Sequence, residues 1–191
     1  MNLLENTPPA QSFSTRDRIL HVAAQQFGAM SYERATLREI ARKSEVDVAY
    51  VHRLFGSKKS LFQDVLAFVF EQYQPPEDAG EGFSHWLVQL SVQTDPVYAG
   101  AGSDPVDLVI NSFSSPDSKE ALEEFLSSKL ITPLAASLTG DRPVDAAEKI
   151  LMFLLGFRLM RKTMQVQTLM DMNKSEVETW LQDILGRLTD G

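Results

Sequence analysis

Residues 36–62 constrain the fold more than any other part of the chain, because they mark two short helices joined by a tight turn: TLREIARKSEVDVAYVHRLFGSKKSLF. Thr36 and Glu39 have the T-x-x-E spacing of a capping box, in which both side chains satisfy free amides at a helix start. Leu37 and Ile40 then follow with the i, i+3 spacing of one buried helix face. The sequence therefore predicts a helix that opens at Leu37.

A second helix should follow the interruption at residues 44–47. Asp47 suits the cap position, and Val51 and Phe55 lie four apart, so they should share a buried face. This spacing is that of a helix-turn-helix, whose second helix enters the DNA major groove in DNA-binding proteins. Lys58 opens the next helix, where free amides and an ammonium group can hold a phosphate. The predicted DNA contacts are Thr36, Arg38, Val48, Ala49, Tyr50, His52, Arg53 and Lys58.

A plainer interpretation of the same pattern stays open, because helix-turn-helix geometry also occurs in proteins that touch no DNA. On that interpretation these are three short helices of a small α domain with a solvated basic face. The distribution of charge favours DNA. The net charge is −8, but residues 1–63 carry 9 basic against 6 acidic residues, and residues 64–191 carry 9 against 20. A basic head on an acidic body directs one face toward DNA, although acidic surface also serves solubility.

Residues 15–62 resemble the N-terminal domain of the TetR family, the tetracycline-repressor-like regulators of bacteria. The matching features are the first helix RILHVAAQQF, an aromatic residue four before the cap threonine, the second helix LREIARKSEV, VHRLF and SKKSLF. Ser31 and Glu45 stand where the family usually has glycine, and His52 and Leu54 also depart from its pattern. A left-handed conformation at Glu45 would cost roughly 1 kcal/mol. The resemblance implies DNA contacts at positions matched by Val48, Ala49, Tyr50, Arg53 and Lys58.

Composition sets the remaining limits. The chain has 191 residues, 43% of them hydrophobic, and no cysteine, which excludes disulfides and thiolate metal sites. The three histidines lack metal-ligand spacing, and no cofactor or nucleophile motif is present, so we expect neither an enzyme nor a cofactor. No apolar run is long enough to span a membrane, and the N-terminus has no signal pattern, so a cytoplasmic location is expected. The predicted division is a flexible arm at 1–14, a helix-turn-helix domain at 15–60 and a helical body at 61–191.

The body should be entirely helical, which makes the chain all-α with about nine helices. A helix is expected to leave the head over residues 61–73, and the others are predicted at 81–93, 104–113, 117–137, 143–165 and 174–189, with a turn before the last. The resemblance implies an internal cavity for an apolar ligand. Candidate lining residues are Phe70, Trp86, Phe113, Phe125, Met152, Phe153 and Phe157, although ordinary core packing explains each of them as well.

The last two long helices also predict a dimer. Residues 146–164 are apolar nearly all round, which requires burial on more than one side, and Gly156 in mid-helix suggests close helix approach. TetR-like regulators dimerise through their last two helices, so the resemblance implies the same. The predicted interface residues are Leu155, Gly156, Leu159, Val177, Trp180, Leu181, Ile184, Leu185 and Leu188.

These observations favour a homodimeric regulator that binds a DNA operator and is released by an apolar small molecule. Repression is what the resemblance implies. Two alternatives remain: a TetR-like DNA binder without a small-molecule inducer, and a helical carrier or enzyme whose head does not bind DNA.

Overall fold

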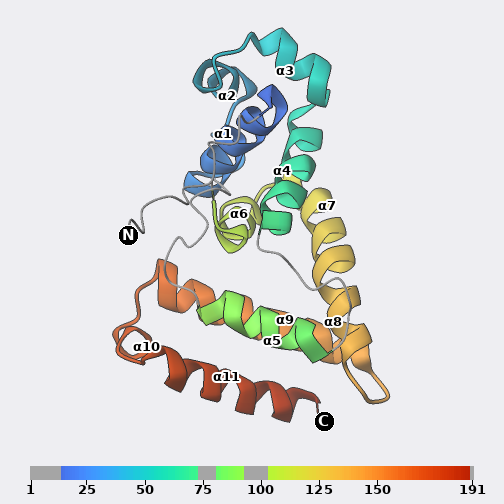
Figure 1. The fold of residues 1–191 in the computed structure, drawn as a ribbon, viewed down its shortest axis with the longest axis vertical. Helices are drawn as coiled ribbons and strands as arrows, with labels where there is room; N and C mark the ends of the chain where they lie inside the picture. The colour runs from blue at the N-terminus through green and yellow to red at the C-terminus, as the bar shows by residue number, and fades with distance from the viewer. Residues whose placement is uncertain (1–13, 73–80, 93–102, 190–191) are drawn as a thin grey trace, which may run out of the picture.

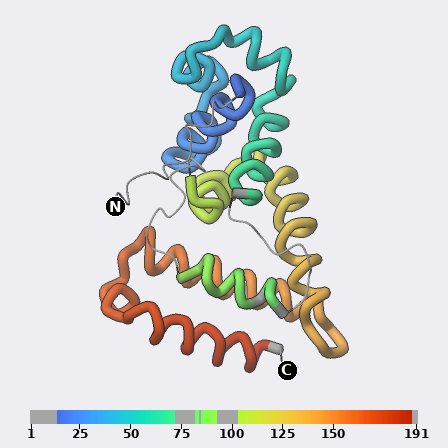
Figure 2. The backbone as a smooth tube through the Cα atoms, in the orientation of Figure 1, coloured from blue at the N-terminus to red at the C-terminus, as the bar shows by residue number. Residues whose placement is uncertain are grey.

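The computed structural model describes residues 14–72, 81–92 and 103–189, and every regular element in these ranges is helical, which confirms the predicted all-α class. The molecule is elongated (Figure 1). A head of four helices lies at one end, three helices are layered at the other, and α6 and α7 lie between them. The tube in Figure 2 shows that the C-terminal helix lies on the side of the body farthest from the head. The predicted arm at residues 1–14 lies almost wholly outside the described residues.

The head begins and ends its helices where local capping residues dictate. Its helices are α1 (Thr15–Ala29), α2 (Leu37–Lys43), α3 (Val48–Phe55) and α4 (Lys58–Gln72). The hydroxyls of Ser14 and Thr36 accept from the amides of Asp17 and Glu39, at 3.1 and 3.2 Å, and Asp47 accepts from the amide of Ala49 at 2.7 Å. Each bond satisfies an amide that a helix start leaves free.

The capping box at Thr36 is completed only on one side. Glu39 does not reach back to the helix start. Its carboxylate instead accepts two hydrogen bonds from Arg42, at 2.9 and 2.7 Å. The i, i+3 spacing of these two residues on the helix surface makes the ion pair available, so it competes with the cap.

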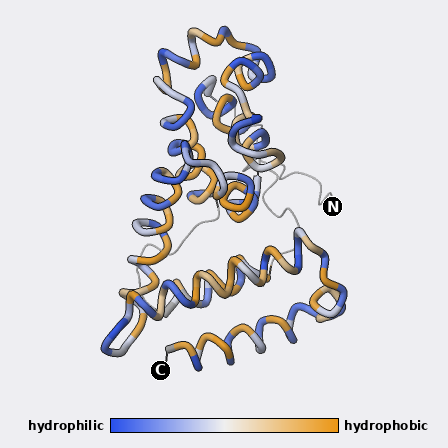
Figure 3. Tube along the Cα trace, turned by 180° about the vertical axis from the view of Figure 1, so that it is seen from behind, coloured by the Kyte–Doolittle hydropathy of each residue, from blue (hydrophilic) through white to orange (hydrophobic). Residues whose placement is uncertain are grey.

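The body contains α5 (Glu81–Val92), α6 (Pro105–Ser112), α7 (Pro116–Phe125), α8 (Thr132–Ser137), α9 (Pro143–Arg158), α10 (Gln167–Met170) and α11 (Lys174–Thr189). Figure 3 shows hydrophobic residues recurring along the whole of α9. Asn173 and Glu176 cap α11 reciprocally, with bonds of 2.8 and 3.0 Å. Helix α10 lies where the sequence predicted only a turn.

Two of the predicted helices are interrupted by wider, π-helical turns. One is Leu126–Ile131, between α7 and α8, and the other is Leu159–Thr163, after α9. The first precedes Pro133, which has no amide to donate and whose ring clashes with the carbonyl four residues earlier, so a widened turn accommodates it. The second leads to Gln165, which has a positive φ of 51° and ends the helix before residue 165.

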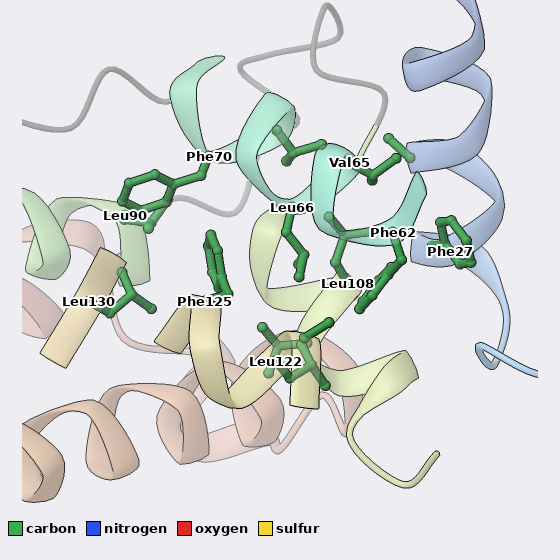
Figure 4. Close-up of a cluster of buried hydrophobic side chains, with 14 of the residues drawn as sticks. Phe27, Phe62, Val65, Leu66, Phe70, Leu90, Leu108, Leu122, Phe125 and Leu130 are labelled. Atoms are coloured by element: carbon green, nitrogen blue, oxygen red, sulfur yellow. The ribbon is translucent and has the colours of Figure 1, made fainter. Parts of the chain in front are cut away.

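The head and the body share one continuous core. Figure 4 shows it running from Phe27 and Phe62 to Phe70 and Leu130. Phe27, Tyr32 and Phe62 pack as an aromatic cluster with ring centroids 5.0 to 5.6 Å apart. No break in apolar packing therefore separates the described helices of the head from those of the body.

Helix α6 fastens the body to the head by polar bonds as well. The side-chain amide of Asn111 donates to the backbone carbonyl of Gly28 at 2.6 Å, and the backbone carbonyl of Asn111 accepts from the backbone amide of Tyr32 at 3.2 Å. At the other end of α6, Ser103 lies so close to Gly28 that a Cβ there would come within 1.8 Å of the serine hydroxyl. Glycine is therefore required at position 28.

Candidate nucleic-acid interface

The turn between α2 and α3 is a Schellman motif. The amide of Glu45 donates to the carbonyl of Arg42 at 3.2 Å, and the amide of Val46 donates to that of Ala41 at 3.0 Å. Glu45 has a φ of 54°, the left-handed conformation that this position requires and that glycine adopts at least cost. The turn thus keeps its geometry although a glutamate occupies the glycine position.

Helix α3 has the inward and outward faces that the sequence predicted. Val51 and Phe55 are buried in the head core, whereas Ala49, His52 and Arg53 are exposed. Val48 and Tyr50 are half-buried and pack partly against the core. Among the outward residues, the first turns of α3 present a small apolar group, an aromatic hydroxyl and a guanidinium, which are the chemical types that bind base edges and phosphates.

An open groove runs beside these residues. It is lined from α3 by Ala49, Tyr50 and Arg53, from the turn by Val46 and Asp47, and from α1 by Thr15 and Arg18. The guanidinium of Arg53 lies 5.0 Å from the ring centroid of Tyr50, so the ring holds it in place by a cation–π contact. Thr15 and Arg18 were missed in the sequence analysis, because they lie some thirty positions away and nothing local relates them to α3.

The other predicted contacts have different surroundings. Thr36 caps α2 and is exposed, as is Arg38. A ring nitrogen of His52 lies 3.2 Å from the carbonyl of Gly56, so this side chain is tied to the end of its own helix. Leu54, which was not a predicted contact, is 39% exposed. Thr36, Arg38 and His52 do not line the groove beside α3.

Lys58 is half-buried rather than free. Its ammonium donates to the carbonyls of Tyr32 and Glu33, the second at 3.5 Å, and lies 4.1 Å from the Tyr32 ring centroid. Burial lowers the pKa of Lys58, with Glu33 and Asp117 opposing that shift. In this structure Lys58 joins the start of α4 to the loop after α1, whereas Lys59 is paired with Glu120.

A small cavity lies in the body behind the head. The volume of this cavity is about 40 Å³. Phe70 and Phe125, from the predicted set, line it together with residues of α5, α6 and α9. Trp86 contacts the Phe70 ring at 5.4 Å. Arg158 and Ser91 are the polar residues among the described residues that line the cavity. Arg158 was missed, although an arginine within a nearly all-apolar helix is a signal for a buried partner.

The remaining predicted pocket residues lie elsewhere. Phe113 and Met152 are 67% and 70% exposed. Phe153 and Phe157 pack on Trp180, with ring centroids 5.6 and 5.7 Å apart. These two rings therefore join α9 to α11 instead of facing the cavity.

The predicted interface residues divide between core and surface. Val177, Leu181 and Leu185 are buried within the chain, and Leu155 lines the cavity. Gly156 and Trp180 are exposed, and Leu159, Ile184 and Leu188 are half-buried. A Cβ on Gly156 would meet nothing within 4 Å, so no other helix among the described residues approaches it closely.

The described residues contain neither a cluster of metal ligands nor a helix that could span a membrane. Within residues 14–72, 81–92 and 103–189, no three His, Asp or Glu side chains gather as a metal site. Over the same part of the chain, no helix is long and apolar enough to cross a membrane.

A helix-turn-helix head with an outward second helix, joined through a shared core to an all-α body, is an architecture typical of helical transcriptional regulators. Residues 19–65 match the bacterial regulatory proteins of the tetR family, and residues 81–188 match the tetracyclin repressor-like C-terminal domain. The chain belongs to the TetR family, whose members are transcriptional regulators rather than enzymes.

Solved structures show the same fold at low sequence identity. NalD, the secondary repressor of the MexAB-OprM multidrug efflux pump in Pseudomonas aeruginosa, has a TM-score of 0.63 at 17% identity, covering 91% of this chain and 94% of NalD. A putative TetR-family transcriptional regulator from Rhodococcus sp. has a TM-score of 0.68 at 14% identity, covering 92% and 98%. The multidrug binding protein EbrR, complexed with imidazole, has a TM-score of 0.60 at 16% identity, covering 96% and 97%. None of the curated protein sequences matches the chain.

Proposed function

We propose that this protein is a homodimeric transcriptional repressor that binds a pseudo-palindromic DNA operator and is released from it by an apolar small molecule. The observation that carries the proposal is the outward face of α3, where Ala49, Tyr50 and Arg53 line one open groove. Arg53 is the proposed base reader, and Ala49 the contact to a thymine methyl. Thr36, Arg38, Val48, His52 and Lys58 complete the proposed interface, with Lys58 reaching phosphate only if it leaves the Tyr32 carbonyl.

The proposed dimer forms through α9 and α11. Met152, Met160 and Trp180 are exposed apolar side chains, and Gly156 lies among them on α9 with open space at its Cα. A second copy packed there would bury these side chains and approach Gly156 closely, giving a two-fold four-helix interface. Two heads held in this way would present their α3 helices to successive major grooves, roughly 34 to 36 Å apart.

Release by a ligand is proposed from the body cavity. NalD is a repressor, and EbrR is a multidrug binding protein. Occupation of the cavity would favour a conformation with α4 tilted, which spreads the two heads and loses the register with the DNA grooves. The continuous core between cavity and head supports this coupling.

A second candidate function is a DNA-binding regulator without a small-molecule ligand. The size of the cavity, about 40 Å³, favours it, because that volume holds only a few waters. A ligand must therefore enlarge the cavity. If no small molecule changes operator affinity, regulation by abundance or by a protein partner replaces the ligand.

The proposal is tested by selecting bound fragments from a random DNA library at a stated salt concentration. We expect a two-fold symmetric motif from the wild-type protein. The Arg53→Ala variant should relax the preference at one position of each half-site by about 1 to 3 kcal/mol. A loss that is equal for all sequences would rule out Arg53 as a base reader, and the absence of any enriched motif would overturn the proposed function.

A further inference from the structure

A network of charges, buried at Arg158 and partly buried at its other members, joins the body cavity to the start of α6. Arg158 of α9 is 3% exposed and lines the cavity. Its guanidinium donates to the carbonyl of Leu90 at 3.0 Å and to the carboxylate of Asp104. Lys162 donates to Asp104 at 3.0 Å and to Asp107 at 2.7 Å. The single cationic residue among the described cavity walls is therefore held by the carboxylate of Asp104, the residue immediately before α6.

Asp104 has two roles at once. It is the N-cap of α6, since its carboxylate accepts from the amide of Val106 at 2.8 Å, and it is the partner of Arg158. Ser103, the residue before it, lies against Gly28 of α1. The segment that receives Arg158 is therefore in direct contact with the head.

We propose, on the basis of the proposed function, that the cavity takes an apolar molecule with one carboxylate, which binds Arg158 in place of Asp104 and loosens the start of α6. The apolar walls would hold the chain of the ligand once the cavity has widened from its present volume of about 40 Å³. A buried guanidinium is the group that pairs best with a carboxylate. The class of ligand is thus an apolar carboxylic acid.

Charge balance makes this exchange feasible. A buried carboxylate left without a partner is costly, but Asp104 keeps its bond to Lys162 when Arg158 turns to the ligand. Arg158 is also the one cationic side chain among the described cavity walls, and no carboxylate lines them, which favours an anionic ligand over a neutral or cationic one.

The first test measures binding to the full chain in the absence of DNA. Isothermal titration is carried out with decanoate, decan-1-ol and decylamine, which share one alkyl chain, below the concentrations at which they form micelles. Decanoate should bind about tenfold more tightly than decan-1-ol, the factor expected for one charge-assisted pair. Equal binding of decanoate and decan-1-ol, or no binding of decanoate, would overturn the proposal.

Variants separate the exchange from simple apolar binding. Asp104→Asn retains a good helix cap and removes the competing carboxylate, so decanoate should bind more tightly than to wild type, again by about tenfold. Asp107→Asn is the matched control, because Asp107 pairs with Lys162, and it should leave decanoate affinity nearly unchanged. Arg158→Met should abolish the preference for decanoate over decan-1-ol. If Arg158→Met does not fold, Arg158→Lys replaces it in the test and should retain part of that preference. Unchanged decanoate affinity in Asp104→Asn would overturn the exchange.

A final arm links the ligand to DNA. Decanoate should weaken operator binding, and by linkage the operator should weaken decanoate binding by the same factor. If decanoate binds at Arg158 as expected but the protein binds no DNA, the proposed function is wrong and the carboxylate site is still supported. If the protein binds an operator but its affinity for the operator is unchanged by decanoate, decan-1-ol and decylamine, the ligand proposal is wrong and the DNA-binding function is still supported.

Discussion

At the scale of single residues, Glu45 and Lys58 are two positions of the head at which a substitution separates different contributions to stability. Glu45 adopts the left-handed conformation of the Schellman turn, with a φ of 54°, and Lys58 is drawn into contact with Tyr32. Both residues lie where the helix-turn-helix meets the rest of the head. Their substitution therefore reports separately on turn strain and on the placement of the ammonium group.

Glu45→Gly is expected to stabilise the protein by about 1 kcal/mol, because glycine adopts the left-handed conformation without the steric cost of a Cβ. Urea unfolding at one fixed protein concentration measures the change in the free energy of unfolding. Glu45→Ala is the control, since alanine keeps the Cβ, and it should give no comparable gain. A gain of similar size in both variants would show that removal of the glutamate charge, not the backbone, is responsible.

Lys58→Ala is expected to lower the free energy of unfolding by about 1 to 3 kcal/mol, because it removes a charged donor from two carbonyls and a ring. Lys59→Ala removes a neighbouring ammonium whose ion pair is exposed, and should cost less than about 1 kcal/mol. Chemical unfolding of both variants decides between the two roles of Lys58. If Lys58→Ala unfolds like wild type and instead lowers the salt slope of DNA binding by about one, Lys58 is a phosphate contact only.

At the scale of elements, sequence predicts what local chemistry determines. The starts of α2, α3 and α11 follow from Thr36, Asp47 and Asn173, since each cap bonds within a few residues of itself. The widened turns after α7 and α9 were not predicted from periodicity, because each is a single short interruption within or at the end of a long apolar helical pattern.

Long-range contacts are what the sequence leaves undetermined. Lys58 and Tyr32 lie 26 positions apart, and Arg158 and Asp104 lie 54 apart, so no local spacing pairs them. Residue type also fails to separate pocket from surface: Phe70 and Phe125 line the cavity, whereas Phe113 and Met152 are exposed. The faces of a nearly all-apolar helix can be assigned only once its neighbours are placed.

The exposed face of α9 leads to a prediction about assembly. Met152→Glu should shift the protein from dimer to monomer, because it would bury an unpaired carboxylate in the proposed interface. Sedimentation velocity over a range of concentrations measures the change. Phe113→Glu introduces the same charge at another exposed apolar position, at the end of α6, and should leave the dimer intact. Equal sedimentation of Met152→Glu and wild type would exclude this face as the interface.

At the scale of the whole molecule, charge and shape agree with one docking face. The basic head lies at one end of an elongated molecule and the acidic body at the other (Figure 1), so the body should be repelled by DNA while the head is attracted. Dimerisation through α9 and α11, at the far end of each protomer, would leave both heads free to bind. Their spacing on DNA is then fixed by the body, not by contacts between heads.

The central claim is that two copies of α3, held by one dimer, read two half-sites on the same side of the duplex. Operator affinity is measured for the selected motif and for the same motif with five extra base pairs between its half-sites, which turns one half-site to the opposite side of the helix. We expect the five-base-pair insertion to reduce the affinity to that of a single half-site. Ten extra base pairs would return the two half-sites to the same side of the duplex but leave them farther apart than in the selected motif. Full affinity with the five-base-pair insertion would contradict the account, because the heads would then bind independently of the dimer.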